Sequence, residues 1–367
     1  MCFVGRRISY SASLFFLFPC CSLLCTVAMT ARSRQQKHKM ARSADLARSA
    51  DPNDAPPALP VLATACDGEV CLWECGATDP LVTFEPHQES ITGLRWTSND
   101  RVLASSSHDG TVALSEPSGR LFHTLRPNSS GATPAILSIT WSPGSRYLAA
   151  GGSDAIVRIF DLQKRAQALV LRGHRAAVRS LSWSPSEVYV ASSSEAGEIV
   201  VHRVQGSVAA VARLEHPPAA HVEVDMVDDA VVDRRKPALG ALQWAPFHPS
   251  LLACAANDGT VAVWEVRPGS TGETPHRLFA EHTKSCTGVQ WSPVNQHLLA
   301  SCSLDQSLCF YDVTKDCTVR TLQCQRALTC MAFAHNGVHC IVGTSLGEVC
   351  SPNSKPTGIN ARLASRH

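Results

Sequence analysis

The 367-residue sequence lacks an excess of charge of either sign, and this narrows the classes of protein that it can encode. It has 33 Lys and Arg against 31 Asp and Glu, a net charge of +2. The chain therefore has neither the basic excess of a nucleic-acid-binding protein nor a long acidic tail. Residues 1–48 hold eight basic residues and one acid, so 25 basic and 30 acidic residues leave residues 49–367 at −5. The basic charge is confined to the amino-terminal end.

Motifs for phosphate, metal and nucleic-acid chemistry are also lacking. There is no G-x-x-x-x-G-K-[ST] loop to hold a phosphate, and the central region has no Arg/Lys stripe interleaved with aromatic residues. None of the 16 cysteines forms a C-x-x-C pair, so we expect mostly buried thiols in a reducing compartment. Six of them have the spacing of alternating strands and not of a metal knuckle: Cys66, Cys71, Cys75, Cys302, Cys309 and Cys317. We therefore expect no metal and no cofactor.

One short motif resembles a catalytic one. Gly343-Thr344-Ser345-Leu346-Gly347 fits the G-x-S-x-G pattern of a hydrolase, which needs a strand-to-helix turn to expose its serine. A strand is expected to follow here instead, so we interpret the segment as structural and predict that the protein is not an enzyme.

The amino-terminal region, residues 1–57, differs from the rest of the chain. Arg6 and Arg7 precede an apolar run over residues 11–29, the layout of a secretory signal. A membrane anchor is a second interpretation, and an upstream extension before a start at Met29 or Met40 is a third. Secretion or membrane attachment is expected only if residues 1–28 are a true signal. Residues 30–57 are polar and Pro-rich, so we expect a disordered lead-in.

The central region repeats. An aromatic residue followed by a turn recurs at intervals of 45, 42, 61, 47 and 42 residues, at Trp96, Trp141, Trp183, Trp244, Trp291 and Phe333. Each is followed by a strand of small residues, a tight turn and a segment that alternates apolar and polar residues. Alternation with a period of two between turn signals predicts half-buried β-strands.

Four short strands every 40 to 45 residues match the WD-repeat β-propeller signature. We predict an all-β, seven-bladed propeller over residues 58–350. Some polar residues recur at the turns and before the inner strands, and in such repeats a histidine and an aspartate bond across one blade. These expected structural blade residues are His87, Asp109, Asp154, His174, Asp258, His282 and Asp305.

Ring closure is expected to be incomplete. The chain enters the ring at the second strand of its first blade, so a later segment should return to supply that blade's innermost strand. After Val349 the sequence becomes polar and Pro-containing, and residues 351–367 read as an aberrant or disordered tail. We therefore expect the innermost strand of the first blade to be absent, with exposed blade edges.

The long interval from Trp183 to Trp244 predicts an insertion over about residues 217–237. A solvated loop and a partner epitope are both open interpretations of this acidic segment.

Four stretches resemble one particular family. They are AGEIVVHRV (196–204), NDGTVAVWEV (257–266), HTKSCTGVQWSPVNQHLLASCSLDQSLCFYDV (282–313) and LTCMAFAHNGVHCIVGTSLGEV (328–349). They are similar to the WD-repeat γ-tubulin ring complex targeting proteins, also called γ-complex WD proteins. In those proteins, as is expected here, the chain also enters the propeller through a partial first blade.

This resemblance implies a non-enzymatic adaptor in the cytoplasm and cytoskeleton. Members of the family bring γ-tubulin ring complexes to spindle poles, centrosomes or spindle microtubules, where microtubules nucleate in mitosis. The resemblance implies that the propeller handles localisation, with spindle microtubule-associated factors as partners, and that a helical carboxy-terminal half binds the γ-tubulin complex. That half has no counterpart in this sequence. We expect no nucleic-acid partner, and the sequence does not identify the partner-binding face.

An alternative comes from another class of protein. Trp264-Glu265-Val266-Arg267 resembles the W-[DE]-x-R ending that substrate receptors of cullin-RING ubiquitin ligases present. Trp264, Glu265 and Arg267 are then candidate contacts for a ligase adaptor.

Overall fold

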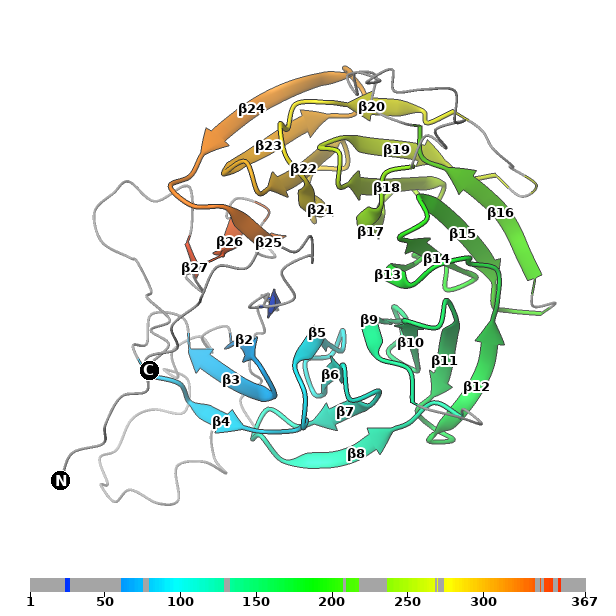
Figure 1. Ribbon diagram of the computed structural model, residues 1–367, viewed down its shortest axis with the longest axis vertical. Helices are drawn as coiled ribbons and strands as arrows, with labels where there is room; N and C mark the ends of the chain where they lie inside the picture. The colour runs from blue at the N-terminus through cyan, green and yellow to red at the C-terminus, as the bar shows by residue number, and fades with distance from the viewer. Residues whose placement is uncertain are drawn as a thin grey trace, which may run out of the picture.

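The computed structural model describes residues 24–26, 61–74, 79–128, 133–206, 209–217, 236–267, 269, 274–333, 337, 340–345 and 349–350. These residues form 27 strands in seven antiparallel sheets and no helix. The sheets stand around a central axis as the blades of a propeller (Figure 1). The predicted all-β, seven-bladed architecture is confirmed.

Consecutive strands are hydrogen-bonded neighbours in every sheet, so each blade is a meander. The first three sheets contain β1 (Leu24–Thr26), β2 (Val61–Cys66), β3 (Glu69–Glu74) and β4 (Val82–Phe84); β5 (Ile91–Trp96), β6 (Leu103–Ser107), β7 (Val112–Ser115) and β8 (Leu121–Leu125); and β9 (Ile136–Trp141), β10 (Tyr147–Gly152), β11 (Val157–Asp161) and β12 (Ala166–Leu171). The next two contain β13 (Val178–Trp183), β14 (Tyr189–Ser194), β15 (Glu198–Arg203) and β16 (Ala209–Glu215); and β17 (Leu239–Trp244), β18 (Leu251–Ala256), β19 (Val261–Glu265) and β20 (Arg277–Phe279). The last two contain β21 (Cys286–Trp291), β22 (Leu298–Ser303), β23 (Ser307–Asp312) and β24 (Cys317–Gln323); and β25 (Leu328–Phe333), β26 (Cys340–Thr344) and β27 (Val349–Cys350).

The second strand of each blade is made of small residues because neighbouring sheets cover both of its faces. In β18, Leu252 and the four residues after it are all 0% exposed. The outer strands differ, since one face meets solvent, and β12 alternates exposed and half-buried positions. The small-residue runs in the sequence therefore mark the middle of each blade and the alternating runs mark its rim.

The hydrophobic core is divided into clusters that lie between neighbouring sheets. In one of them, Ile199 and Val201 of β15 pack with Leu242 of β17 and Trp264 of β19. Burial of apolar surface contributes about 25 cal/mol per Å², so these contacts are a large part of what holds adjacent blades together.

The recurring aromatic residues join one blade to the next. The indole Nε1 of Trp141 donates to the carbonyl of Arg95 at 2.9 Å, and that of Trp291 donates to the carbonyl of Gln243 at 3.2 Å. The Gln243 side chain also accepts the backbone N–H of Trp291 at 2.6 Å, and Gln290 accepts that of Phe333 at 2.8 Å. Arg95, Gln243 and Gln290, each just before a recurring aromatic residue, therefore contact the next blade, a role that the sequence analysis missed.

The innermost strand of the first blade was expected to be absent, and this expectation is wrong. Strand β1 pairs antiparallel with β2, with Leu24 opposite Ala65 and Thr26 opposite Ala63. It lies in the centre of Figure 1, on the inner side of β2 and beside β5 and β25. The strand comes from the apolar run of residues 11–29, because a short apolar segment can pair with an open sheet edge as readily as it can form the core of a signal.

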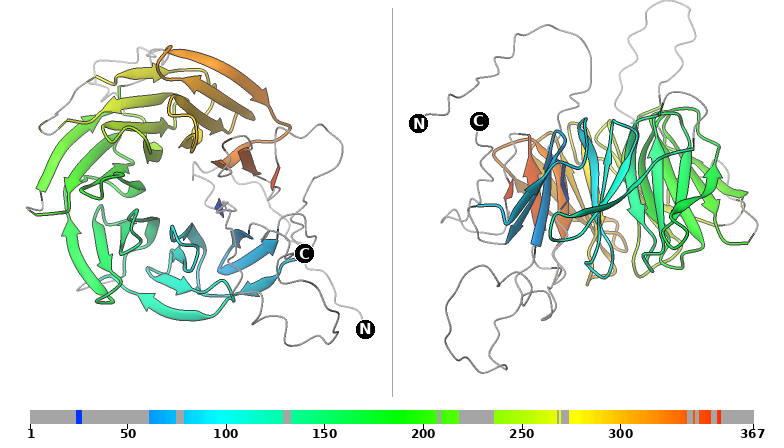
Figure 2. Two further views of the ribbon diagram at one scale, coloured as in Figure 1. Left: turned by 180° about the vertical axis from the view of Figure 1, so that it is seen from behind. Right: turned by 90° about the horizontal axis from the view of Figure 1, so that it is seen from below.

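The first and last sheets still differ from the others. β1 has three residues, and the seventh sheet has three strands within the described residues, the last of them only two residues long. Figure 2 shows these two sheets side by side where the chain closes the ring. The amino-terminal region over residues 1–57 apart from β1, the tail over residues 351–367 and most of the insertion, residues 218–235, lie outside the described residues.

No helix in the described ranges is long and apolar enough to cross a membrane. Of the ten cysteines whose environment is described, five are buried, three are half-buried and two are exposed. Burial raises the pKa of the Cys340 thiol to about 12. The expectation of mostly buried thiols therefore applies to half of them.

Candidate functional site

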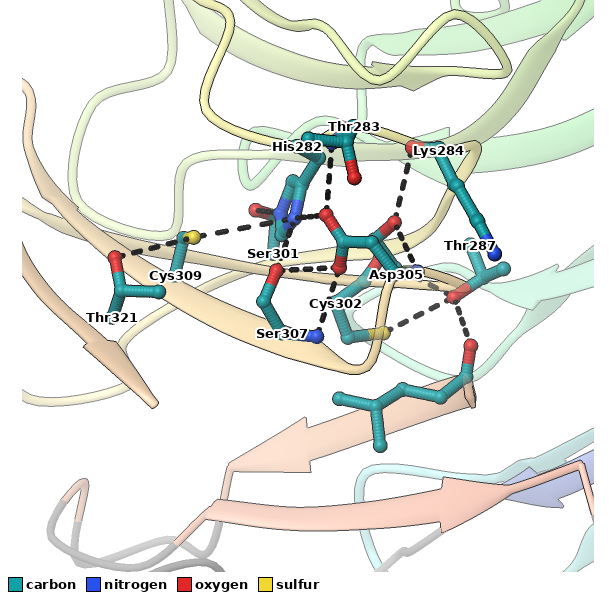
Figure 3. Close-up of polar contacts among 12 residues, drawn as sticks. His282, Thr283, Lys284, Thr287, Ser301, Cys302, Asp305, Ser307, Cys309 and Thr321 are labelled. Atoms are coloured by element: carbon teal, nitrogen blue, oxygen red, sulfur yellow. Dashed lines mark hydrogen bonds and ion pairs between the residues drawn. The ribbon is translucent and has the colours of Figure 1, made fainter. Parts of the chain in front are cut away.

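The turn between β22 and β23 holds a hydrogen-bonded group around Asp305 (Figure 3). His282, from the loop before β21, lies with Nδ1 3.1 Å from Asp305 Oδ2 and 2.7 Å from Ser307 Oγ. Asp305 also accepts the backbone N–H of Thr283 at 2.9 Å and that of Ser307 at 2.8 Å. One carboxylate thus fixes both its own turn and the loop that leads into the inner strand.

The same group continues into the sheet. His282 Nε2 is 2.7 Å from Ser301 Oγ, which is 3.0 Å from the hydroxyl of Tyr311. Burial lowers the pKa of His282, but Cys309 and the Asp305 carboxylate raise it by more, so its pKa lies above the usual value. Burial raises the pKa of Asp305, whereas its hydrogen bonds to Ser307 and Thr283 and the His282 charge lower it below the ordinary range. The two directions agree, which supports an ion pair across the blade.

The turn between β6 and β7 repeats this arrangement. His87 Nδ1 is 3.0 Å from Asp109 Oδ2, and Nε2 is 2.9 Å from Ser105 Oγ. Asp109 accepts the backbone N–H of Thr111 at 2.8 Å. The structure therefore brings together two of the expected His–Asp pairs, His87 with Asp109 and His282 with Asp305.

Two other blades use different partners. Asp154 accepts two hydrogen bonds from the buried Arg158 guanidinium, at 2.6 and 3.1 Å, in the place of a histidine pair. His174 lies 3.4 Å from Glu198 at the start of β15. The Glu198 carboxylate, with 4% of its side chain exposed, also accepts from Arg213 at 2.6 Å. Burial lowers the pKa of His174 to about 4, so this histidine is neutral near pH 7.

Asp258 has a histidine that the sequence analysis missed. Its carboxylate accepts the hydroxyl of Thr260 at 2.6 Å, and the Thr260 oxygen lies 3.4 Å from His216 Nε2. His216 is 42 residues before Asp258, because the insertion separates it from its inner strand. Shortening that interval by about 20 residues, the length of the insertion, would have placed His216 in register with His87 and His282.

These networks stabilise turns and show no arrangement for catalysis. A hydrogen bond to a charged group contributes about 1.5–3 kcal/mol, and loss of one partner leaves the other buried and unsatisfied. The described residues hold no group of three or more His, Cys, Asp or Glu side chains that could bind a metal ion. In the G-x-S-x-G segment, Ser345 donates its backbone N–H to the Ala327 carbonyl at 2.9 Å, directly after strand β26.

The three candidate ligase contacts are divided between the core and the surface. Trp264 is 1% exposed and belongs to the cluster between the fourth and fifth sheets. Glu265 and Arg267 form an exposed ion pair at 2.9 Å, with 39% and 70% of their side chains exposed. Only the two charged residues are therefore accessible to a partner.

A cavity of about 320 Å³ lies between the fifth and sixth blades. The residues that line it are His248, Leu251, His276, Arg277, Trp291, Gln296, His297, Val313 and Thr314. It lies outside the His–Asp networks, at turns whose sequences differ from blade to blade.

The repeat architecture, the aromatic joints and the His–Asp turns define a WD-repeat β-propeller protein. The model of the "WD domain, G-beta repeat" family matches residues 78–114, 119–161, 166–202 and 273–312. Each match runs from the outer strand of one blade into the third strand of the next. The region with the insertion, β16 to β19, is not among the matched ranges.

Among curated proteins, the chain is similar to Protein NEDD1 of mouse, with 28% identity over 77% of this chain, and to that of human, with 25% identity over 77%. The match spans 39% of the length of each of these relatives. Cell division cycle 20.1, cofactor of APC complex, of Arabidopsis thaliana is 27% identical over 67% of this chain and 50% of its own length. The similarity to Protein NEDD1 confirms the resemblance to the γ-tubulin ring complex targeting WD proteins.

A solved structure shares the fold. A chain in the crystal structure of the mitotic checkpoint complex aligns with a TM-score of 0.58 at 20% identity, over 70% of this chain and 72% of that chain. At this identity the similarity shows the fold alone.

Proposed function

We propose that this chain is a non-enzymatic adaptor that localises γ-tubulin ring complexes to spindle poles, centrosomes or spindle microtubules for nucleation in mitosis. The observation that carries the proposal is the similarity to Protein NEDD1, which extends over 77% of the chain. Similarity to a cell division cycle 20 protein supports a mitotic role of the same kind.

The geometry of the described blades supports a scaffold. Their polar networks are used to fix turns, and their buried carboxylates are paired with His, Arg or hydroxyl groups. What such a propeller offers is a rigid ring with variable surface turns, which suits protein recognition. Within the adaptor, we assign localisation to the propeller.

The experiment is live imaging of the tagged full chain in dividing cells, together with co-precipitation of γ-tubulin from mitotic extract. We expect enrichment at spindle poles over the surrounding cytoplasm. A matched control is Arg120→Glu. It reverses an exposed charge just before β8, the outer strand of the second blade, and should leave localisation unchanged. A folded chain that stays diffuse through mitosis would contradict the proposal.

The second candidate function, a substrate receptor of a cullin-RING ligase, is favoured by one observation, the exposed Glu265–Arg267 pair. If this function holds, Arg267→Ala abolishes co-precipitation of the ligase adaptor and leaves spindle localisation intact. If the spindle function alone holds, the wild-type chain retains no ligase adaptor.

A further inference from the structure

The cavity between the fifth and sixth blades is formed where the turns of these blades meet. His248 comes from the turn between β17 and β18, and His297 from the equivalent turn between β21 and β22. Their rings are 6.2 Å apart, which brings the two turns together. Trp291 and Val313, 3% and 4% exposed, give the cavity an apolar wall. The cavity volume of about 320 Å³ is enough for one or two side chains of a ligand.

The lining of this cavity contains hydrogen-bond donors and a positive charge, with no acidic residue among its nine members. Arg277, at the start of β20, is the one permanent cation in this set, and three histidines line the same cavity. Arg277 Nε lies 3.4 Å from Asp316, but 53% of the Asp316 side chain is exposed, so water screens this pair. The cavity is therefore complementary to a negatively charged group.

Two exposed apolar side chains lie in the turns that carry His248 and Gln296, and one of them, Val294, also lies against Gly337 of the seventh blade. Phe247, 47% exposed, directly precedes His248, and Val294, 63% exposed, lies two residues before Gln296. Both residues lie in the turn between the first and second strands of a blade, Phe247 in the fifth blade and Val294 in the sixth. Most other large apolar side chains that are exposed in the described residues lie on strands instead, namely Leu121, Phe122, Val170, Leu278 and Val319. Turns that carry both exposed apolar side chains and lining residues of a cavity with a cation can offer a peptide apolar and charged contacts together.

We propose that the cavity, together with Phe247 and Val294, is a docking surface for a short protein segment of acidic and apolar residues. An acidic side chain enters beside Arg277, and apolar side chains of the segment pack on Phe247 and Val294. The proposal supplies a partner surface for the adaptor function and rests on that function only for the identity of the partner.

The test begins with selection of a random 12-residue peptide library displayed on phage against the immobilised full chain. We expect the enriched peptides to combine Asp or Glu with Leu, Phe or Ile. The strongest peptide, labelled with fluorescein, is then titrated with the wild-type chain and with Arg277→Glu and Phe247→Ser. Each variant is expected to weaken binding tenfold or more, and the matched charge reversal Arg120→Glu is expected to leave it unchanged.

Thermal melting of all three variants serves as the folding control, and Phe247→Ser tests the surface independently if Arg277→Glu melts early. Enrichment of basic peptides, failure to enrich any peptide, or equal binding to wild-type chain and both folded variants would overturn the proposal. The adaptor function is tested separately, by spindle localisation. Peptide binding without spindle localisation of the wild-type chain removes the adaptor function alone. Spindle localisation of a wild-type chain that enriches no acidic and apolar peptide removes the docking surface alone.

Discussion

The joints between interior blades and the joint that closes the ring are built differently. Between the fifth and sixth blades, Trp291 donates both its backbone and its indole N–H to Gln243. Between the sixth and seventh blades, Gln290 accepts the backbone N–H of Phe333. At the closing joint the position before Phe333 is Ala332, whose methyl group has no acceptor, and the strand beside it is the three-residue β1.

The repeating sequence therefore provides contacts between blades only where the two blades are consecutive in the chain. The interior joints are encoded by residues that recur with the blade period. The closing joint joins segments far apart in sequence, and its small β1 pairs with β2 over only three residues. We therefore expect the stability of the ring to be uneven, with the closing joint as its weaker region.

The largest effect is expected for Trp291→Ala at an interior joint. Removal of this buried ring and its indole hydrogen bond should lower the free energy of unfolding by about 3–5 kcal/mol. The matched change at the joint between the sixth and seventh blades, Phe333→Ala, should cost less because Phe333 is only half-buried. Urea denaturation of both variants measures the difference, and equal losses would show that burial of the recurring aromatic ring does not set the strength of a joint.

The next effect is expected for Asp305→Ala within an interior blade. Loss of the carboxylate leaves His282 and two backbone N–H groups without their acceptor, at a cost of about 2–3 kcal/mol. Asp316→Asn is the control, since asparagine tolerates the φ of 54° at this position, the side chain is half-exposed and its ion pair is screened. Chemical denaturation should show little change for the control. A loss as large for Asp316 would mean that the buried network has no special role.

A smaller effect is expected at the closing joint itself. A chain that starts at Met40 lacks β1, and loss of three cross-strand pairs should cost about 1 kcal/mol. Hydrogen exchange should speed up at the backbone amides of β2, residues 61–66, and stay unchanged in β22, residues 298–303. Unchanged exchange in β2 would show that β1 does not protect this edge.

The smallest effect concerns two buried histidines in different interior blades, His174 and His282, whose pKa values are shifted in opposite directions. The pKa of His174 is lowered to about 4, so its contribution to stability falls as the pH drops from about 6.5 towards 4. The pKa of His282 is raised, so its contribution is present below about 6.5 and is lost as the pH rises through the folded pKa. NMR titration of the ring protons, assigned with His174→Gln and His282→Gln, should give midpoints on opposite sides of the ordinary value. Equal midpoints would contradict the assignment of Glu198 and Asp305 to different roles.

Much of the fold could be predicted because it repeats. Trp96, Trp141 and Trp183 recur at nearly constant spacing and each ends an innermost strand. The pairs His87–Asp109 and His282–Asp305 could be found since their spacing, 22 and 23 residues, is set by the length of one blade. His216 was missed because the insertion breaks that spacing, although the turn chemistry is kept through Thr260.

Other residues could not be found from the repeat at all. Glu198 replaces the expected turn aspartate from a position three residues beyond Glu195, and only the folded blade shows which of the two acids faces His174. Strand β1 lies in a segment whose composition suits a signal as well as a strand. The candidate docking surface was also invisible. Phe247 and Val294 lie three residues after Trp244 and Trp291, in turns that recur, but the residue at that position changes from blade to blade.

By itself, the sequence determined the class of strands, their number per repeat, the propeller architecture and the family resemblance, because each of these depends on local alternation and on the distance between like residues. Only the tertiary structure decided which segment closes the first blade, which acid meets each buried histidine, and which turns of neighbouring blades join into a cavity. These depend on contacts between residues tens to hundreds of positions apart, which no local pattern records.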